Sequence, residues 1–491
     1  MQASTIAAHR FGFSEANLQA LQGDPRGWVM AQFRTPAPFD SSGLPTGPEA
    51  GQLTREALAT VLTGVPGVPG VPATPGAVAA TRPRGAAGTM DGGNAALADM
   101  MSPGGRFVAP PGIVAPPALQ GARLRLRDAN QAGLQRRWKQ VVTTSTPVYE
   151  RWVMFWANHF CVAATKGATL GMVWPHEREA IRPLATGKFA DMVRASTLHP
   201  GMLLYLDNAQ SIGPDSKAGQ RRKRGLNENL ARELLELHTV GVHGGYTQAD
   251  VTELAKLLTG WSVTRTGLAD TEFTPTLHQP GTKTVMGKVY PEGPQAVDQL
   301  FVDLSRHPST SQYIAGKLVR HFVSDEPPAA LVDAVAARFR DTDGDLMAVA
   351  DTLFGNDLAW SPDTAQKFKR PEELVLSAHR MLGVPIAPNV AQANRLTTLV
   401  SDMGQPPGRP PSPQGWPDRN EDWLATDSLW KRITWAASFG AQSAAFVDAR
   451  QLAVASLGPD LAPRTRDQIA RAETGGQALA LLLSSPDFQR R

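Results

Sequence analysis

The sequence predicts a mainly α-helical protein, and three observations support this fold class. Segments along most of the chain place apolar residues at the i, i+3 and i+4 spacing of an amphipathic helix. The alternating pattern of a β-strand is scarce, and its best example is Thr282 to Tyr290. The chain has 491 residues, 42% hydrophobic and 19% charged, so it can bury a large core. We expect a large helical domain with a short β element near 282–290 and long Pro/Gly-rich loops.

Proline and glycine set the expected organisation of the chain. Residues 1–63 are predicted to form an N-terminal helical part, and residues 106–491 the main helical domain. Between them, residues 64–105 contain GVPGVPGVPATPGAV and similar text, which is typical of a disordered low-complexity insert. A second Pro/Gly-rich stretch, Gly404 to Asn420, is flanked by aromatic and charged residues, which favours a fixed loop.

The predicted helices follow one another from residue 147 onward, and several have recognisable start signals. Thr247 and Asp250 form an N-capping pattern, and Pro371 opens a helix whose first turn holds two glutamates. Asp345 is expected to cap the helix that begins at Leu346, since the calcium-loop pattern around it lacks its final glutamate. The helical segments are Pro147 to Ala164, Gly187 to Ala195, Asn227 to Val240, Thr247 to Thr259, Thr310 to Phe322, Ala329 to Arg340, Leu346 to Phe354, Glu372 to Leu382, Val390 to Met403 and Thr474 to Leu483.

Charge, cysteine content and the N-terminal residues exclude several classes of protein. A net charge of +4 with 49 basic and 45 acidic residues is too small to indicate nucleic-acid binding, and the one basic run, residues 217–224, favours a solvated loop. No signal-like or membrane-spanning apolar run is found, so the chain as written is expected to be cytoplasmic. Because Cys161 is the single cysteine, a metal centre would have to use histidine and carboxylate ligands. No cofactor is indicated.

The segment Asn227 to Gly245 contains the most informative polar pattern. At roughly 100° per residue, Glu228, Asn229, Arg232, Glu233 and Glu236 share one arc of the predicted helix. One interpretation is an ordinary amphipathic helix with surface ion pairs and a hydrogen-bonded core histidine, His238. The other is the wall of a cleft, in which Arg232 holds one glutamate ionised while a less solvated one, such as Glu233, works as acid or base.

A second candidate segment lies in the predicted helix that begins at Pro147. Trp152, Phe155, Trp156 and His159 fall on one face, and Asn158 is a second polar group on a helix that is apolar nearly all round. A buried amide or imidazole without a partner costs about 1–3 kcal/mol. Asn158 and His159 therefore indicate either a structural polar network or a site.

The remaining candidates lie in loops and at helix ends. His278 and Lys283 belong to a loop bounded by proline and glycine, for which a functional and an ordinary role are equally supported. His307 and His321 stand at the two ends of one predicted helix, which favours capping and packing. The signatures HExxH, GxxxxGK[ST], GxSxG and a strand-linked GxGxxG are missing.

Taken together, these segments resemble a family of bacterial proteins called domain of unknown function 1800. The resemblance implies a mostly helical protein, often exported, and often encoded beside a sulfatase-like family called domain of unknown function 1501. It raises the expectation that the polar residues Asn158, His159, Asn227, Glu228, Asn229, Arg232, Glu233, His238 and His278 converge. The residues that carry it are Ala7 to Phe13, Asp24 to Trp28, Trp156 to Phe160, Asn227 to His238, Gly244 to Gln248, Leu258 to Trp261, His278 with Lys283 and Gly287, Lys369 to Pro371, Gly404 with Gln405, Gly415 to Pro417, Trp423, and Ser484 to Arg491.

Two functions are compatible with the sequence. The first is a hydrolase-like enzyme with a cleft in which Glu228 or Glu233 is acid or base. Arg232 would orient it or clamp an anion, and His159 or His238 would carry a proton or bind a metal. Asn158, Asn227, Asn229, His278 and Lys283 would contact the substrate, and Trp416 and Trp423, expected to be exposed, would suit a glycan. The second is a non-catalytic binding or assembly protein that acts with the sulfatase-like partner. No nucleic acid is expected as a partner.

Overall fold

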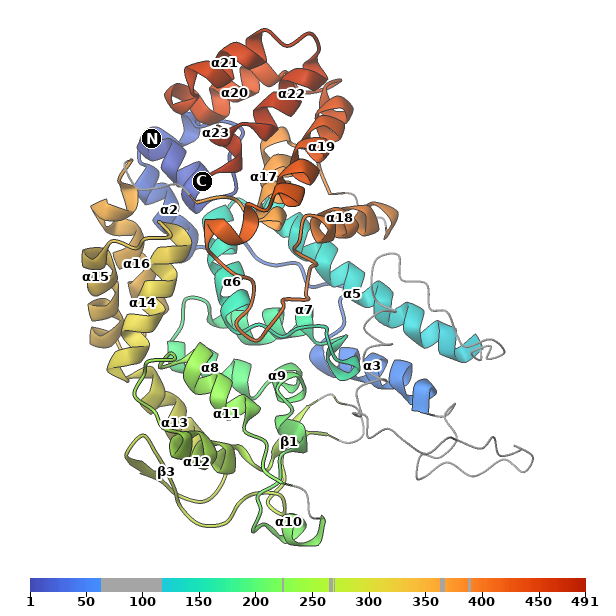
Figure 1. The fold of residues 1–491 in the computed structure, drawn as a ribbon, viewed down its shortest axis with the longest axis vertical. Coiled ribbons are helices and arrows are strands. Elements are labelled where there is room, and N and C mark those ends of the chain that lie inside the picture. Colours follow the sequence, from blue (N-terminus) through green and yellow to red (C-terminus); the bar gives the residue numbers. More distant parts are fainter. Residues whose placement is uncertain (63–116, 223–224, 265–267, 269, 363–366, 387–389) are drawn as a thin grey trace.

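The computed structural model describes residues 1–62, 117–222, 225–264, 268, 270–362, 367–386 and 390–491 (Figure 1). In this part of the chain helices dominate, and the strands form two antiparallel sheets of two strands each. The prediction of a mainly α fold is therefore confirmed. The predicted insert, residues 64–105, lies outside the described residues, as do residues 223 and 224 of the basic run, whose first six residues form a short helix rather than a loop.

The helices and strands carry the labels of Figure 1. The α-helices are α1 (Ala3–Thr5), α2 (Pro25–Arg34), α3 (Gly47–Leu62), α5 (Pro117–Thr143), α6 (Pro147–His159), α7 (Val173–His176), α8 (Phe189–Thr197), α9 (Pro200–Tyr205), α10 (Lys217–Arg222), α11 (Asn229–Glu233), α12 (Gln248–Leu258), α13 (Ala296–Ser305), α14 (Pro308–Phe322), α15 (Ala329–Asp341), α16 (Leu346–Gly355), α17 (Pro371–Leu382), α18 (Val390–Asp402), α19 (Thr426–Ser443), α20 (Ala449–Leu457), α21 (Pro463–Ala470), α22 (Gly475–Ser484) and α23 (Pro486–Gln489). Three π-helical turns, η1 (Ile6–Phe11), η4 (Glu177–Ile181) and η7 (Leu234–His238), directly follow α1, α7 and α11. The strands are β1 (Trp261–Val263), β2 (Thr271–Phe273), β3 (Lys283–Val285) and β4 (Lys288–Tyr290).

Helix α6 lies between the two large hydrophobic cores of the molecule. Its residues Trp152, Phe155 and Trp156 belong to the core that also contains α14 and α16. Met154, on another face of α6, belongs to the core formed mainly by α5, α17, α19 and α22. This position explains why α6 is apolar nearly all round. The polar residues Asn158 and His159 lie in its last turn.

The two ends of the chain lie close together, and the last residue joins a buried ionic network (Figure 1). The Glu373 carboxylate, 1% exposed on α17, is 2.7 Å from Nη1 of Arg151 on α6, 3.1 Å from Nη2 of Arg370 and 3.3 Å from Nε of Arg491. Burial alone would raise the pKa of Glu373, but the three guanidinium groups lower it well below its usual value. Glu373 therefore stays ionised and links α6, α17 and the last residue of the chain.

Local helix-start signals and the short β element are found where the sequence predicts them. Thr247 and Asp250 cap α12 reciprocally, with the Thr247 amide donating to the Asp250 carboxylate at 2.7 Å. The Asp345 carboxylate accepts from the Ala348 amide at 3.0 Å and caps α16. Strands β3 and β4 form the predicted short β element, and the two residues between them, Met286 and Gly287, have positive φ angles of 48° and 77°.

A candidate active-site cavity beside helix α6

Asn158, at the end of α6, fixes the Pro/Gly-rich loop that the sequence predicts to be ordered. Its side-chain Oδ1 accepts from the Trp416 amide at 2.8 Å, and its Nδ2 donates to the Trp416 carbonyl at 3.0 Å. The loop approaches closely because Gly415 has no side chain: a Cβ there would lie 2.4 Å from the Asn158 carbonyl oxygen. Asn158 thus acts on the loop backbone and holds Trp416 in place.

This loop, α6 and α14 enclose a cavity of about 360 Å³, which we call the α14 cavity. Its volume is that of a small-molecule site. The loop contributes an aromatic ring and charged groups, and α14 contributes a row of polar side chains. The lining residues are Phe155, Asn158, His159, Tyr313, Lys317, Arg320, His321, Gln414, Trp416, Pro417, Asp418, Arg419 and Asp422.

Lys317 is the most unusual group in the α14 cavity. Its Nζ is 2.9 Å from Nδ1 of His159, and no carboxylate within the described ranges forms an ion pair with it. Burial, which disfavours the charged amine, lowers the pKa of Lys317 to about 8. At neutral pH a minor fraction of this amine is therefore unprotonated, far more than for a lysine with the usual pKa.

The partner of Lys317, His159, is neutral, and its tautomer follows from its contacts. His159 is 1% exposed, and burial together with the nearby Lys317 charge lowers its pKa well below the usual value. Its Nε2 is 3.1 Å from the His238 carbonyl oxygen. Since a carbonyl can only accept, Nε2 carries the proton, and Nδ1 is left to accept from Lys317. His159 therefore orients the amine without adding charge.

A second pair, His321 and Asp418, lines the same cavity. Nδ1 of His321 is 3.0 Å from Oδ1 of Asp418, and Nζ of Lys367 is 3.7 Å from Oδ2. Burial lowers the pKa of His321 to about 4. Burial would raise the pKa of Asp418, but His321, Lys367 and Arg370 together lower it. Asp418 is ionised, and the neutral His321 donates to it.

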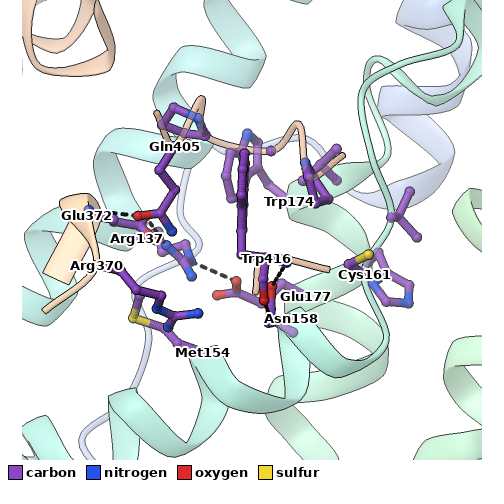
Figure 2. A pocket seen from close by; sticks show the side chains of 17 residues that line it. Arg137, Met154, Asn158, Cys161, Trp174, Glu177, Arg370, Glu372, Gln405 and Trp416 are labelled. Atoms are coloured by element: carbon purple, nitrogen blue, oxygen red, sulfur yellow. Dashed lines mark hydrogen bonds and ion pairs between the residues drawn. The ribbon is translucent and has the colours of Figure 1, made fainter. Parts of the chain in front are cut away.

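A smaller cavity lies on the other side of Asn158 and Trp416 (Figure 2). Its volume of about 70 Å³ is enough for only a few water molecules. Figure 2 shows Arg137 between two carboxylates, with Nε 2.7 Å from Glu177 and Nη1 2.5 Å from Glu372. Charges that neutralise one another in so small a space are typical of a structural network, so the α14 cavity is the better candidate site.

The arc of polar residues from Glu228 to Glu236, on α11 and the adjoining η7, does not line either cavity. Arg232 lies 3.3 Å from Glu228 and 3.4 Å from Glu236 in partly exposed ion pairs, as the amphipathic interpretation predicts. Hydrogen bonds from Thr252 and Gln248 lower the pKa of Glu228.

The other members of this segment lie at and below the surface. The Asn227 side chain accepts from the Asn229 amide at 2.9 Å, which starts the helix. Glu233 is half-buried, and burial followed by the charge of Glu236 raises its pKa. Burial raises the pKa of the Cys161 thiol, and the Glu233 charge adds a smaller effect in the same direction. The charge of Glu233 thus affects the pKa of a residue just beyond the end of α6.

His238 is buried and lies beside His159, but its ring is not hydrogen-bonded as the amphipathic interpretation predicted. The two imidazole centres are 6.1 Å apart, and neither ring nitrogen of His238 has a hydrogen-bond partner among the described residues. Burial lowers the pKa of His238 to about 3, so the ring is neutral. The expectation failed because the backbone carbonyl of His238, not its ring, makes the contact with His159.

The His278 loop forms a separate cluster. Nζ of Lys283 is 3.1 Å from Nε2 of His278 and donates to the Gly281 carbonyl at 2.7 Å. Nδ1 of His278 lies 2.7 Å from the carbonyl oxygen of Thr259. Neither residue lines the α14 cavity, and these contacts close the loop on itself.

The prediction that Trp416 and Trp423 are both exposed is wrong for Trp423. Trp423 is 5% exposed, donates to the Pro417 carbonyl at 3.2 Å and lies with its ring centre 6.1 Å from that of Trp416. Trp416 is partly exposed and lines the cavity. The loop folds back over Trp423, so a single tryptophan faces the cavity.

Sequence reasoning missed the polar face of α14. Tyr313, Lys317, Arg320 and His321 have the spacing i, i+4, i+7 and i+8, which places them on one side of the helix. His307 caps α14 as expected, with Nδ1 accepting from the Ser309 amide. His321 packs against Phe155 as expected, but it also pairs with Asp418 across the cavity. The spacing of these polar residues is visible in the sequence, but the prediction for this helix rested on its apolar residues alone.

Neither a metal-binding cluster nor a membrane span is found in the described part of the chain. Within those ranges, no group of three or more His, Cys, Asp or Glu side chains is arranged to hold a metal ion. None of the helices that the structure describes is long and apolar enough to cross a membrane.

Comparison with known proteins gives one match. No curated protein and no solved structure matches the chain significantly. The family model described as a protein of unknown function, DUF1800, matches residues 6–490, nearly the whole chain. The chain therefore belongs to the DUF1800 family, as the sequence motifs predicted.

Proposed function

We propose that the protein is a hydrolase-like enzyme whose active site is the α14 cavity and whose general base is Lys317. The observation that carries this proposal is the unpaired amine of Lys317 on the wall of a cavity of substrate size. An amine held out of bulk water without a carboxylate costs folding free energy, and groups in such surroundings concentrate at functional sites. His159 gives the amine a fixed direction without neutralising it.

The proposed reaction is hydrolysis of an ester or amide. The neutral amine of Lys317 accepts a proton from a water molecule, and the hydroxide adds to the acyl carbon. The bond from that carbon to the leaving oxygen or nitrogen then breaks, and the leaving group takes the proton from the Lys317 ammonium. A base with a pKa near the working pH serves both steps, because it can accept and return the proton.

An acyl substrate fits the cavity better than the glycosidic bond that the sequence suggested. Glycoside hydrolysis uses two carboxyl groups, one of which has a raised pKa. The carboxylates in the α14 cavity are Asp418, held ionised by His321 and Lys367, and Asp422, which is exposed. Glu233 has a raised pKa but does not line the cavity. The catalytic roles first predicted for Glu228, Glu233 and Arg232 have no support from the cavity lining.

The test is hydrolysis of activated esters by the full chain. We expect the wild type to hydrolyse p-nitrophenyl acetate or butyrate with a rate that rises through a kinetic pKa near 8. The Lys317→Met variant should lose about 100-fold or more of this rate. Lys288→Met, which removes an exposed lysine on β4, is the matched control and should keep the wild-type rate. Ester hydrolysis that is undetectable in the folded wild type, or unchanged in Lys317→Met, would contradict the proposal.

A second candidate function, an assembly role with the sulfatase-like family, is favoured by one apolar surface. Trp430 and Ile433, 68% and 51% exposed, lie three residues apart on α19, and Leu424 precedes that helix at 45% exposed. Exposed tryptophan is common in protein interfaces. A complex with a domain of unknown function 1501 protein that co-elutes in gel filtration, and that Trp430→Glu disrupts, would support this role. Absence of the complex, or its survival in Trp430→Glu, would contradict it.

A further inference from the structure

Arg320, one turn of α14 beyond Lys317, is a second cation of the cavity, and it has no ion-pair partner among the described residues. Its side chain lines the α14 cavity. Its Nε is buried without a hydrogen bond, and across the described part of the chain no carboxylate or carbonyl contacts its guanidinium group within bonding distance. The N–H donors of this partly buried guanidinium therefore have no partner among the described residues.

Arg320 differs in this respect from the buried arginines of the same molecule. The fully buried arginines all contact carboxylates or backbone carbonyls. Arg151 and Arg370 bind Glu373, Arg137 binds Glu177 and Glu372, and Arg10 donates to the Ala359 carbonyl. Arg432 donates to the Lys369 carbonyl, and Arg491 contacts Glu373. Each of these arginines has at least one carboxylate or carbonyl partner. A buried nitrogen without a hydrogen bond also occurs in several of them, such as Arg10 and Arg432. Arg320 differs because, among the described residues, no carboxylate or carbonyl contacts any of its guanidinium nitrogens.

The charge of Arg320 acts on the neighbouring groups of the cavity. It contributes to the lowered pKa of Lys317, after burial and the opposing effects of Asp418 and Cys161. It also opposes the effect of burial, which raises the pKa of Tyr313. Two unpaired cations on one helix face repel one another, and an anion between or beside them would relieve this repulsion.

The carboxylates of the cavity do not supply that anion. Asp418 is already bound to His321 and Lys367. Asp422 accepts from the Arg419 amide at 3.3 Å, where it caps the short helical turn that contains Trp423. The Arg419 guanidinium itself is 3.8 Å from Glu326 at the surface. Of the cavity cations, Lys317 and Arg320 are the two left for a ligand.

We propose that the substrate of the α14 cavity carries an oxyanion group, a carboxylate, sulfate or phosphate, which Arg320 binds while the scissile acyl bond faces Lys317. The proposal rests on the proposed hydrolase function and adds the substrate class. The planar guanidinium suits the paired oxygens of these groups, whereas Lys317 acts as a single donor or base. Trp416 offers an apolar surface for the body of the substrate.

The binding test uses succinate, sulfate and phosphate in calorimetric titrations of the full chain at constant ionic strength. We expect the wild type to bind at least one of them, and the three titrations show which oxyanion is preferred. Arg320→Gln should weaken that affinity about tenfold or more, and Arg320→Lys should keep part of it. Arg338→Gln, an exposed arginine on α15, is the matched control and should bind as the wild type does. Equal affinity in Arg320→Gln and the wild type, or no binding of any of the three anions, would overturn the proposal.

Ester kinetics separate this proposal from the proposed function. The wild type should prefer the anionic p-nitrophenyl hemisuccinate over the neutral p-nitrophenyl butyrate in kcat/KM, and Arg320→Gln should reduce that preference about tenfold. If Lys317→Met abolishes hydrolysis but Arg320→Gln leaves the preference unchanged, the hydrolase function stands and the substrate class is wrong. If Arg320 binds anions but hydrolysis does not depend on Lys317, the function fails and the anion site stands.

Discussion

Replacing Lys317 by methionine should stabilise the folded protein at neutral pH. Methionine has a similar length and no charge, so it removes the cost of holding an ammonium in the α14 cavity. Few substitutions of buried residues are expected to increase stability. Where such a substitution lies in an active site, the gain arises because it removes a group that is kept for function. A stabilising Lys317→Met substitution would therefore be evidence that Lys317 is not there to hold the fold together.

The size of the effect follows from the pKa of Lys317. A shift from 10.5 to about 8 corresponds to about 3 kcal/mol of unfavourable free energy while the amine is protonated in both states. Loss of the hydrogen bond to His159 offsets about 1 kcal/mol of this gain. The variant should be more stable than the wild type by about 2 kcal/mol at pH 7.

The sign of the pH dependence distinguishes this cause from better packing. Between the folded pKa of about 8 and the unfolded value of 10.5, the unfolded wild type holds a proton that the folded wild type has released. Wild-type stability therefore rises with pH in this window relative to the variant. Urea unfolding at pH 7 and pH 9.5 should show the advantage of Lys317→Met shrinking by about 2 kcal/mol. An advantage that does not change with pH, or a variant that is less stable at pH 7, would refute the reasoning.

Three further predictions concern the surroundings of the cavity. Glu373→Gln should lower the free energy of unfolding by about 3–5 kcal/mol, because it leaves buried guanidinium groups without their carboxylate; a loss below about 1 kcal/mol in urea unfolding would argue against the network. Asn158→Ala should remove both contacts to the Trp416 backbone and speed hydrogen exchange of the Trp416 amide, whereas unchanged exchange would mean that the loop is held by other contacts. Cys161 is buried, and burial raises its pKa to about 12. It should thus react with Ellman's reagent only after unfolding, and rapid reaction of the native protein would show that the thiol is accessible.

Much of the fold could be predicted because its signals are local. The Thr247 cap, the Asp345 cap and the short β element near 282–290 depend on a few neighbouring residues, and each forms as expected, the last as a hairpin of two short strands. Helices α5 and α19 were not predicted. Buried positions on α5, such as Leu126 and Leu134, are separated by arginine and glutamine, and α19 exposes Trp430 and Ile433. Their stability comes from packing against other helices, which a local apolar pattern does not reveal.

The candidate site was harder to predict because residues far apart in the sequence form it. Asn158 and His159 were singled out correctly as polar groups that need partners, and their partners are Trp416 and Lys317. The residues near Lys317 in the sequence do not show that its amine has no carboxylate partner, because its surroundings depend on how α6 and the 404–423 loop pack against α14. The glutamates between Glu228 and Glu236 were predicted to form a site because they are closely spaced, yet Glu228 and Glu236 form partly exposed ion pairs with Arg232.

The central claim is that Lys317 presents a reachable amine with a lowered pKa to the α14 cavity, and competitive labelling tests it most directly. The full chain is acetylated with a trace of acetic anhydride from pH 6.5 to 11, and the rate at each lysine is read by peptide mass spectrometry. We predict that the labelling of Lys317 rises through a pKa near 8, and the exposed Lys139, labelled in the same samples, is the reference lysine. Labelling of Lys317 that follows the same curve as Lys139, or that occurs only after unfolding, would contradict the account.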